Sequence, residues 1–160
     1  MPHILIVCTA NICRSPLVEA IIRDRLVKSG KTDWIVSSAG TWAEWERGAA
    51  RYSIQLAEEQ GLDITQHQAR MITGEIAQKA DLILCMTANH KESIQIDPSL
   101  RSASGKVYLL SEMVGRSYDI VDPYGGPFEG YVTMNKEVNQ LISDGFDRIV
   151  ELASQNAEAV

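Results

Sequence analysis

The sequence predicts a single α/β domain with a central, four-stranded parallel sheet and helices on both of its faces. Two observations predict it. Four short runs rich in aliphatic and β-branched residues alternate along the chain with longer stretches whose apolar residues recur at helical spacing. The 160 residues also suit one domain, because a chain of this size buries about 70% of its unfolded surface when it folds.

The individual elements follow from this apolar patterning. Strands are expected at residues 3–8, 34–38, 81–86 and 106–110. Helices are expected at about residues 16–28, 49–60, 88–96 and 129–152. The last helix has apolar residues at helical spacing, such as Val138, Leu141 and Ile142, which indicates a face that packs on the core. We assign residues 1–160 to one domain and expect the tail from about residue 154 to fray.

The loop between the first strand and the first helix is the main candidate site. Ile4-Leu5-Ile6-Val7 is typical of a strand buried on both faces of a parallel sheet, so Cys8 stands at the carboxyl end of that strand. Ser15 and Pro16 suit the N-cap and the first position of the following helix. Residues 8–14, called the Cys8 loop below, therefore lie at the sheet edge where ligands bind in such folds.

The Cys8 loop has the features of an oxyanion site that carries a nucleophile. Backbone N–H groups at a helix N-terminus and the positive end of the helix dipole attract anions. Arg14, six residues after Cys8, offers a planar fork that fits two oxygens of a phosphate or arsenate. We expect these positive groups to hold Cys8 as the nucleophilic thiolate. The Cys-x5-Arg spacing alone is a weak signal, and the strand, Asn11 and the Ser-Pro pair around it support a functional loop.

A second irregular stretch, residues 122–127, precedes the last helix. Pro123 restricts Asp122 to extended conformations, so the carboxyl group is presented from a loop. Next to a thiolate and a phosphate, two negative neighbours would favour the protonated acid, which could then donate a proton to a leaving oxygen. Asp-Pro and Gly-Gly pairs are also common in simple turns, and the residues alone leave both interpretations open.

The cysteines point to a reducing compartment. Cys8, Cys13 and Cys85 form an odd set and lack the paired Cys/His spacing of a structural zinc site, so we expect no metal. Cytoplasmic residence is the expected location. Cys13, five residues after Cys8, is either a buried small side chain or a partner for a protective disulfide under oxidation.

Charge and hydropathy exclude two further classes. The net charge of −6 argues against nucleic-acid binding, because proteins of that class usually display a basic patch that releases counterions. The chain contains no stretch of 18 apolar residues, the length that would predict a membrane helix, so we expect no membrane partner. Any anion site must therefore be local.

The segment Val7-Cys8-Thr9-Ala10-Asn11-Ile12-Cys13-Arg14-Ser15-Pro16 resembles the signature of low-molecular-weight protein tyrosine phosphatases. Four further stretches match this family in order: Ser38-Ala39-Gly40-Thr41, His67-Gln68-Ala69-Arg70, Asp81-Leu82-Ile83-Leu84-Cys85-Met86 and Asp122-Pro123-Tyr124. The match spans nearly the whole chain. It implies a Rossmann-like, phosphotyrosine phosphatase I-like fold.

The resemblance implies a protein-tyrosine-phosphatase that needs no cofactor. Cys8 would attack phosphorus to form a phosphocysteine intermediate, while Arg14 and the loop N–H groups bind the equatorial oxygens. Asp122 would protonate the departing phenolate and then activate the hydrolytic water. The implied partners are phosphotyrosine-containing proteins, with a tyrosine kinase as one candidate, and we expect a monomer.

The resemblance also assigns supporting residues. The phosphate-binding positions besides Arg14 are Thr9, Ala10, Asn11, Ile12, Cys13 and Ser15. Asn11 tolerates positive φ and can tie the loop to its neighbours. The Ser15 hydroxyl either stabilises the thiolate, as the family suggests, or caps the helix. Ser38 and His67 are expected in a structural network behind the loop.

Aromatic residues are candidates for the walls of a slot that grips the phosphotyrosine ring. Tyr124 and Trp42 are the stronger candidates and Trp45 the weaker one. Two departures from the family bear on substrate choice and loop geometry. The segment 42–53 matches the family's variable loop poorly, and Ala10 stands where glycine is most usual, which would cost about 1–2 kcal/mol if positive φ were required there.

Three alternatives compete with this interpretation. A thioredoxin-coupled arsenate reductase would need two further cysteines close together, whereas only Cys85 lies outside the loop. Phosphoarginine hydrolysis on the same fold is associated with Thr at the position of Ile12, and Ile12 offers an apolar wall instead. An inactive phosphate-binding module is disfavoured because Cys8, Arg14 and Asp122 are all present.

Overall fold

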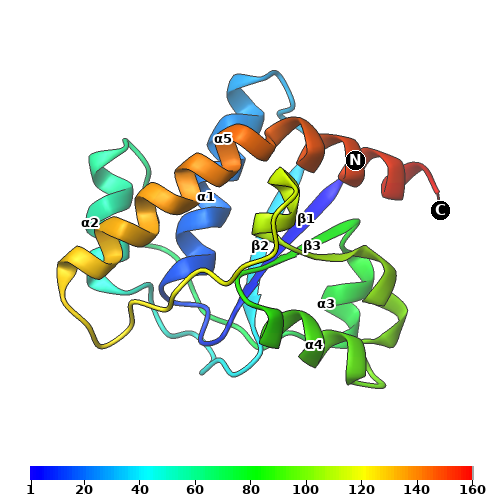
Figure 1. Ribbon diagram of the computed structural model, residues 1–160, viewed down its shortest axis with the longest axis horizontal. Helices are drawn as coiled ribbons and strands as arrows, with labels where there is room; N and C mark the ends of the chain where they lie inside the picture. The colour runs from blue at the N-terminus through cyan, green and yellow to red at the C-terminus, as the bar shows by residue number, and fades with distance from the viewer. Residues whose placement is uncertain (160) are drawn as a thin grey trace.

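A parallel sheet forms the centre of the molecule, whose computed structural model describes residues 1–159 (Figure 1). The strands are β1 (His3–Cys8), β2 (Ile35–Gly40), β3 (Leu82–Cys85) and β4 (Val107–Leu109). They lie in the order β2-β1-β3-β4, and every neighbouring pair is parallel. The predicted four-stranded parallel sheet is therefore confirmed, with the bounds of β1 as predicted and those of the other three strands shifted by one or two residues.

Helices cover both faces of the sheet (Figure 1). The helices are α1 (Arg14–Lys28), α2 (Arg51–Glu59), α3 (Gly74–Lys79), α4 (Ala88–Ile96) and α5 (Phe128–Glu158), with 3-10 helices η1 (Arg101–Lys106) and η2 (Leu110–Val114). Alternate residues of β1 enter two separate apolar cores, because successive side chains of a strand point to opposite faces. Ile4 and Ile6 join the core under α1, α2 and α5, whereas Leu5 and Val7 join the core under α3 and α4. Burying both faces of β1 fixes where its carboxyl end, and hence Cys8, emerges.

The start of α1 differs from the expectation. The helix begins at Arg14 with Cys13 as N-cap, and no side chain caps it. The predicted N-cap, Ser15, instead lies inside the first turn, fully buried, with its hydroxyl 3.0 Å from the Cys8 sulfur. The Ser15 hydroxyl therefore contacts the Cys8 sulfur and does not cap the helix, as the Ser-Pro pair had suggested.

The last helix is longer than expected. The sequence predicts its end at about residue 152, whereas α5 continues to Glu158, through most of the tail expected to fray. Ala153 is fully buried, and the Asn156 side-chain amide donates a hydrogen bond of 2.8 Å to the Asp81 carbonyl. These contacts tie the last turns of α5 to the amino end of β3. None of the helices in residues 1–159 combines the length and apolar character needed to cross a bilayer.

The packing of α5 on η2 depends on a residue without a side chain. A Cβ added at Gly145 would lie 2.7 Å from the Met113 Cβ and 3.1 Å from the Met113 carbonyl oxygen. We expect Gly145→Ala to lower the free energy of unfolding by about 1–2 kcal/mol, because overpacking outweighs the gain of about 1 kcal/mol in helix propensity. Urea unfolding followed by circular dichroism measures the change.

A matched control lies near the start of the same helix. A Cβ at Gly130 would meet the Pro123 Cβ at an ordinary 3.7 Å, so Gly130→Ala should leave the stability unchanged or slightly higher. Equal stability of Gly145→Ala and Gly130→Ala would show that the close approach of α5 to η2 does not limit this packing.

Candidate active site

The Cys8 loop has its carbonyl groups turned away from its centre. Five of its carbonyl oxygens accept hydrogen bonds of 2.6–3.0 Å from the surrounding scaffold: Cys8 from the Thr41 N–H, Thr9 from the Trp42 N–H, Asn11 from His67 Nε2, Ile12 from the Ala50 N–H and Cys13 from the Ser53 hydroxyl. In a planar trans peptide the N–H points opposite to the carbonyl of the same unit. The N–H groups that follow these carbonyls therefore face the concave side of the loop, where an oxyanion would be bound.

One residue of the Cys8 loop has a left-handed backbone, and it is Asn11, with φ of 59°. Asn tolerates this region at low cost. Ala10 is not among the residues with positive φ, so the departure from glycine brings no backbone strain. At the end of β2, Gly40 pairs with Cys8, and a Cβ there would lie 2.3 Å from the Thr9 carbonyl oxygen. The loop thus rests directly on the backbone of β2.

The fully buried Asn11 side chain ties this turn to its surroundings. Its amide N–H2 donates to the hydroxyls of Ser15 at 2.7 Å and Ser38 at 2.9 Å. Its amide oxygen accepts the Arg70 N–H at 3.0 Å. His67 Nε2 donates to the Asn11 carbonyl at 2.6 Å, so Ser38 and His67 lie in a network behind the loop, as the sequence predicted. Every polar atom of the Asn11 side chain therefore has a partner, which fixes the loop in one conformation.

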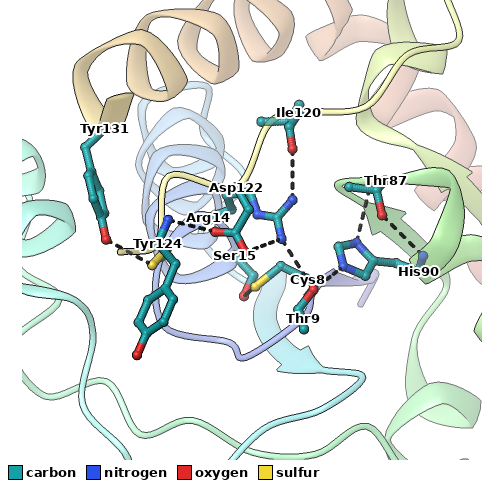
Figure 2. Close-up of polar contacts among 11 residues, drawn as sticks. Cys8, Thr9, Arg14, Ser15, Thr87, His90, Ile120, Asp122, Tyr124 and Tyr131 are labelled. Carbon is teal, nitrogen blue, oxygen red and sulfur yellow. Dashed lines mark hydrogen bonds and ion pairs between the residues drawn. The ribbon is translucent and has the colours of Figure 1, made fainter. Parts of the chain in front are cut away.

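Cys8 is buried at the base of the concave side, with its sulfur 3.0 Å from the Ser15 hydroxyl oxygen (Figure 2). Because Asn11 already donates to that oxygen, the Ser15 hydroxyl hydrogen is free to point at the sulfur. Such a hydrogen bond stabilises a thiolate more than a thiol, since hydrogen bonds to charged groups are the stronger ones. The geometry therefore favours the first of the two roles considered for Ser15.

Arg14 points its guanidinium into the same space from the first turn of α1, and its side chain is almost entirely buried (Figure 2). Nη1 donates to the Ile120 carbonyl at 2.8 Å, and Nη2 lies 3.5 Å from the Thr9 hydroxyl and 3.4 Å from an Asp122 carboxylate oxygen. Within residues 1–159, Nε is a buried donor without a hydrogen-bond partner. Leaving a buried donor unpaired costs about 1–3 kcal/mol, which an oxyanion accepting from this edge of the fork would relieve.

Asp122 reaches this site from the other end of the chain. One carboxylate oxygen accepts the Tyr124 N–H at 3.1 Å, and the other faces Arg14. The side chain is 45% exposed, so the group can exchange protons with solvent. The two interpretations of this stretch are compatible, because a tight turn is what presents the carboxylate to the loop (Figure 2).

A cavity of about 290 Å³ is lined by these groups. We call the part lined by buried side chains, such as Cys8 and Arg14, the base, and the part lined by exposed side chains, such as Trp42 and Tyr124, the mouth. The lining residues predicted from the sequence are Cys8, Thr9, Ala10, Ile12, Cys13, Arg14, Trp42, Asp122 and Tyr124. Trp45 does not line the cavity, whereas Trp42 and Tyr124 do, and both of these side chains are largely exposed. The volume lies near the lower end for ligand pockets and suits one aromatic side chain with its phosphate.

The other two cysteines are in less reactive settings. Burial raises the pKa of Cys13 to about 11, and its sulfur lies 3.5 Å from the Tyr131 hydroxyl. Cys85 is fully buried in β3, and burial raises its pKa as well. It belongs to the core under α3 and α4, whereas Cys8 belongs to the opposite core. Arsenate reduction would need two further cysteines close together, whereas Cys13 lies in the loop and Cys85 in the core on the other face of the sheet.

Sequence reasoning missed four groups at the site: Glu44, which lines the cavity, Arg47, His90 and the carbonyl of Ile120. Arg47 lines the cavity, donates to the Tyr124 hydroxyl at 3.2 Å and lies 5.6 Å from the centre of its ring. His90 contacts the Thr9 hydroxyl at 2.8 Å. No spacing in the sequence signals these contacts, because each joins segments that only the fold brings together.

Comparisons with known proteins agree with this geometry. Residues 3–157 match the family model of the low molecular weight phosphotyrosine protein phosphatases. A probable low molecular weight protein-tyrosine-phosphatase EpsP from Ralstonia nicotianae is 35% identical over 144 residues, which cover 90% of each chain. The low molecular weight protein-tyrosine-phosphatase PtpB of Staphylococcus aureus is 35% identical over 139 residues, covering 87% of this chain and 93% of the relative.

Solved structures give the same result. The crystal structure of a low molecular weight protein tyrosine phosphatase from T. tengcongensis superposes with a TM-score of 0.86 at 33% identity, covering 92% of this chain and 99% of the other. The YwlE arginine phosphatase from Geobacillus stearothermophilus superposes with a TM-score of 0.82 at 30% identity, covering 94% of this chain and 95% of the other. The parallel sheet, the loop at its edge and a family match over almost the whole chain lead to one conclusion: this chain is an enzyme of the low molecular weight phosphotyrosine protein phosphatase family.

Proposed function

We propose that the enzyme hydrolyses phosphotyrosine in proteins through a phosphocysteine intermediate. In this proposal Cys8 is the nucleophile, Arg14 and the loop N–H groups bind the phosphate, and Asp122 is the general acid and base. One observation carries the proposal: Cys8, Arg14 and Asp122 line a single cavity together with Ile12, Trp42 and Tyr124. No cofactor takes part in this scheme.

The first step transfers the phosphoryl group to sulfur. The Cys8 thiolate attacks phosphorus opposite the leaving oxygen, so an S–P bond forms while the P–O bond to the phenol breaks. Protonated Asp122 gives its proton to the departing phenolate oxygen. Arg14 and the inward-facing N–H groups bind the three equatorial oxygens, and they bind them more tightly as charge develops in the transition state.

The second step releases phosphate. Asp122, now a carboxylate, takes a proton from a water molecule whose oxygen attacks phosphorus. The S–P bond breaks, inorganic phosphate leaves and the thiolate is restored. The Ser15 hydroxyl supports both steps, because a hydrogen bond to the sulfur stabilises the thiolate as reactant and as leaving group. The three free cysteines support a reducing, cytoplasmic setting for this chemistry.

The mouth of the cavity supports tyrosine as the phosphorylated residue. Ile12, Trp42 and Tyr124 provide flat or apolar surface around the space above the phosphate site, which suits an aromatic ring. Protein substrates with phosphotyrosine, including a tyrosine kinase as one candidate, follow from this preference. The mouth is exposed, so a phosphorylated side chain on a protein surface or a flexible segment could reach it.

Phosphoarginine is the second candidate substrate, because arginine phosphatases are among the similar structures. One feature of this cavity favours tyrosine over it: Ile12 offers no hydroxyl to a cationic leaving group. Arg47 would repel a second guanidinium, whereas Glu44, which lines the same cavity, would attract one, so these two charges do not separate the substrates.

The roles of Cys8 and Asp122 are tested by phosphate ester hydrolysis. Cys8→Ser should show no turnover. Asp122→Ala should lose about 10²- to 10⁴-fold in kcat on phenyl phosphate, because the poor leaving group needs the proton. The loss should be much smaller on p-nitrophenyl phosphate, whose leaving group departs without protonation. Steady-state assays on both esters, with thermal unfolding to confirm that each variant is folded, measure these effects.

Two outcomes would contradict the mechanism. Retained activity in Cys8→Ser would exclude the sulfur as nucleophile. An equal loss on the two esters in Asp122→Ala would remove the carboxylate from proton transfer and leave it a positional role beside Arg14.

Ile12→Thr tests the substrate preference. We expect wild type to favour a phosphotyrosine peptide over the matching phosphoarginine peptide, and the variant to lower this ratio of kcat/KM values roughly tenfold, the effect of a small change in an apolar pocket wall. Phosphate release from the two peptides measures the ratio. A wild-type preference for phosphoarginine would overturn the tyrosine assignment, and an unchanged ratio in the variant would remove Ile12 from the argument.

A further inference from the structure

His90 connects α4 to the Cys8 loop. The residue lies in the first turn of α4 and is 4% exposed. Its Nδ1 accepts the Thr87 N–H at 3.1 Å, and its Nε2 lies 2.8 Å from the hydroxyl oxygen of Thr9, the residue after the nucleophile (Figure 2). The ring thus contacts the loop on the side where the Arg14 guanidinium lies.

The direction of the second hydrogen bond follows from the first. Because Nδ1 accepts a hydrogen bond from the Thr87 N–H, a neutral imidazole must carry its proton on Nε2. Burial, assisted by the positive charge of Arg14, lowers the pKa of His90 to about 4, so the ring is neutral near physiological pH. Nε2–H therefore donates and the Thr9 oxygen accepts.

The Thr9 hydroxyl oxygen is in turn a hydrogen-bond acceptor for the Arg14 guanidinium. Arg14 is held by groups from three segments: the Ile120 carbonyl at 2.8 Å, the Asp122 carboxylate at 3.4 Å and the Thr9 hydroxyl at 3.5 Å. Of these three groups, the Thr9 hydroxyl belongs to the Cys8 loop. At 3.5 Å its contact with Nη2 is long, so small displacements of the hydroxyl decide whether the bond forms. A donor that fixes the hydroxyl oxygen therefore influences where the fork lies relative to the sulfur.

We propose that His90 is a positioning residue, which holds the Thr9 hydroxyl as an acceptor for Arg14 and thereby sets the fork against the equatorial oxygens of the transition state. The inference rests on the proposed function, because it assumes that Arg14 binds the phosphoryl group. The fork matters most when charge develops on those oxygens, so loss of the positioning bond should lower kcat more than it raises KM.

The helix start permits a sharp pair of variants. Thr87 and His90 form a capping box, in which Gln is a favourable replacement at the second position. In His90→Gln the amide oxygen can accept the Thr87 N–H while the amide nitrogen donates to Thr9. His90→Leu keeps an apolar volume and loses both bonds. If His90 had only a structural role, the activity of each variant would follow its thermal stability. If His90 positions Thr9, the Gln variant, whose amide nitrogen donates to Thr9, should restore the activity that the Leu variant loses.

The experiment measures kcat and KM on phenyl phosphate, inhibition by orthovanadate and by inorganic phosphate, and thermal unfolding. His90→Leu should lose roughly tenfold in kcat, the effect of about one hydrogen bond, with a smaller change in KM. Inhibition by orthovanadate, which resembles the transition state, should weaken more than inhibition by phosphate. His90→Gln should restore most of the loss. An unchanged kcat in a folded His90→Leu, or equal defects in the Gln and Leu variants, would overturn the proposal.

Thr9 provides the second side of a double-mutant cycle. Thr9→Val should lose as much as His90→Leu, and the double variant Thr9→Val/His90→Leu should be no worse than Thr9→Val alone. Additive losses would show that His90 acts by another route. If His90→Leu does not fold, ¹⁵N NMR of the wild-type imidazole decides the case: a proton on Nδ1 instead of Nε2 near neutral pH would refute the bond.

The proposed function and this inference can fail separately. If wild type hydrolysed no aryl phosphate, the proposed function would be wrong. Orthovanadate affinity, measured by calorimetry on the same variants, would still test His90: weaker binding in Leu than in Gln supports the positioning bond, and equal binding overturns it.

Discussion

The outward rotation of the carbonyl groups in the Cys8 loop is the constraint on which the rest of the site depends. Peptide N–H groups can converge on an anion only if the carbonyls of the same units find donors elsewhere. The scaffold supplies these donors from the segment after β2, from α2 and from His67. Asn11 adds the left-handed residue that closes the curve, with four hydrogen bonds that offset its backbone cost. The N–H arrangement on which the proposed phosphate binding depends is therefore built into the fold.

The site divides into a rigid base and an adaptable mouth. The base consists of side chains that are almost fully buried, such as Cys8, Asn11 and Arg14. The mouth uses exposed side chains on loops, such as Trp42 and Tyr124, although the Trp42 N–H is bound to the base. A side chain at the mouth can change without disturbing the backbone contact that anchors it. Substrate choice within one chemistry can therefore vary at the mouth while the base stays constant.

Much of the fold was predictable because burial leaves a periodic trace in the sequence. The aliphatic run before Cys8 predicted a strand covered on both faces, and β1 is that strand. The capping role considered for Ser15 was wrong, because the Ser-Pro pair signals a cap locally and only the family resemblance pointed to the contact of the hydroxyl with the sulfur. The short α3 was missed although Thr73, whose hydroxyl accepts the Ile76 N–H, is a local N-cap signal. The last turns of α5 were missed because tertiary contacts, such as Asn156 with Asp81, decide them. His90 and Arg47 escaped for the same reason: their partners lie far away along the chain.

The close approach of Gly40 to the Thr9 carbonyl has a consequence for how such a chain can diverge. The strand end and the loop share one packed backbone interface with no room for even a methyl group. Selection on catalysis must therefore reach into β2, a strand that supplies no reacting group, and must hold a glycine there. As the sequence diverges, Gly40 would tolerate as little change as the active-site residues. A map of mutational tolerance would therefore include part of β2 in the functional region, although this strand supplies no reacting group.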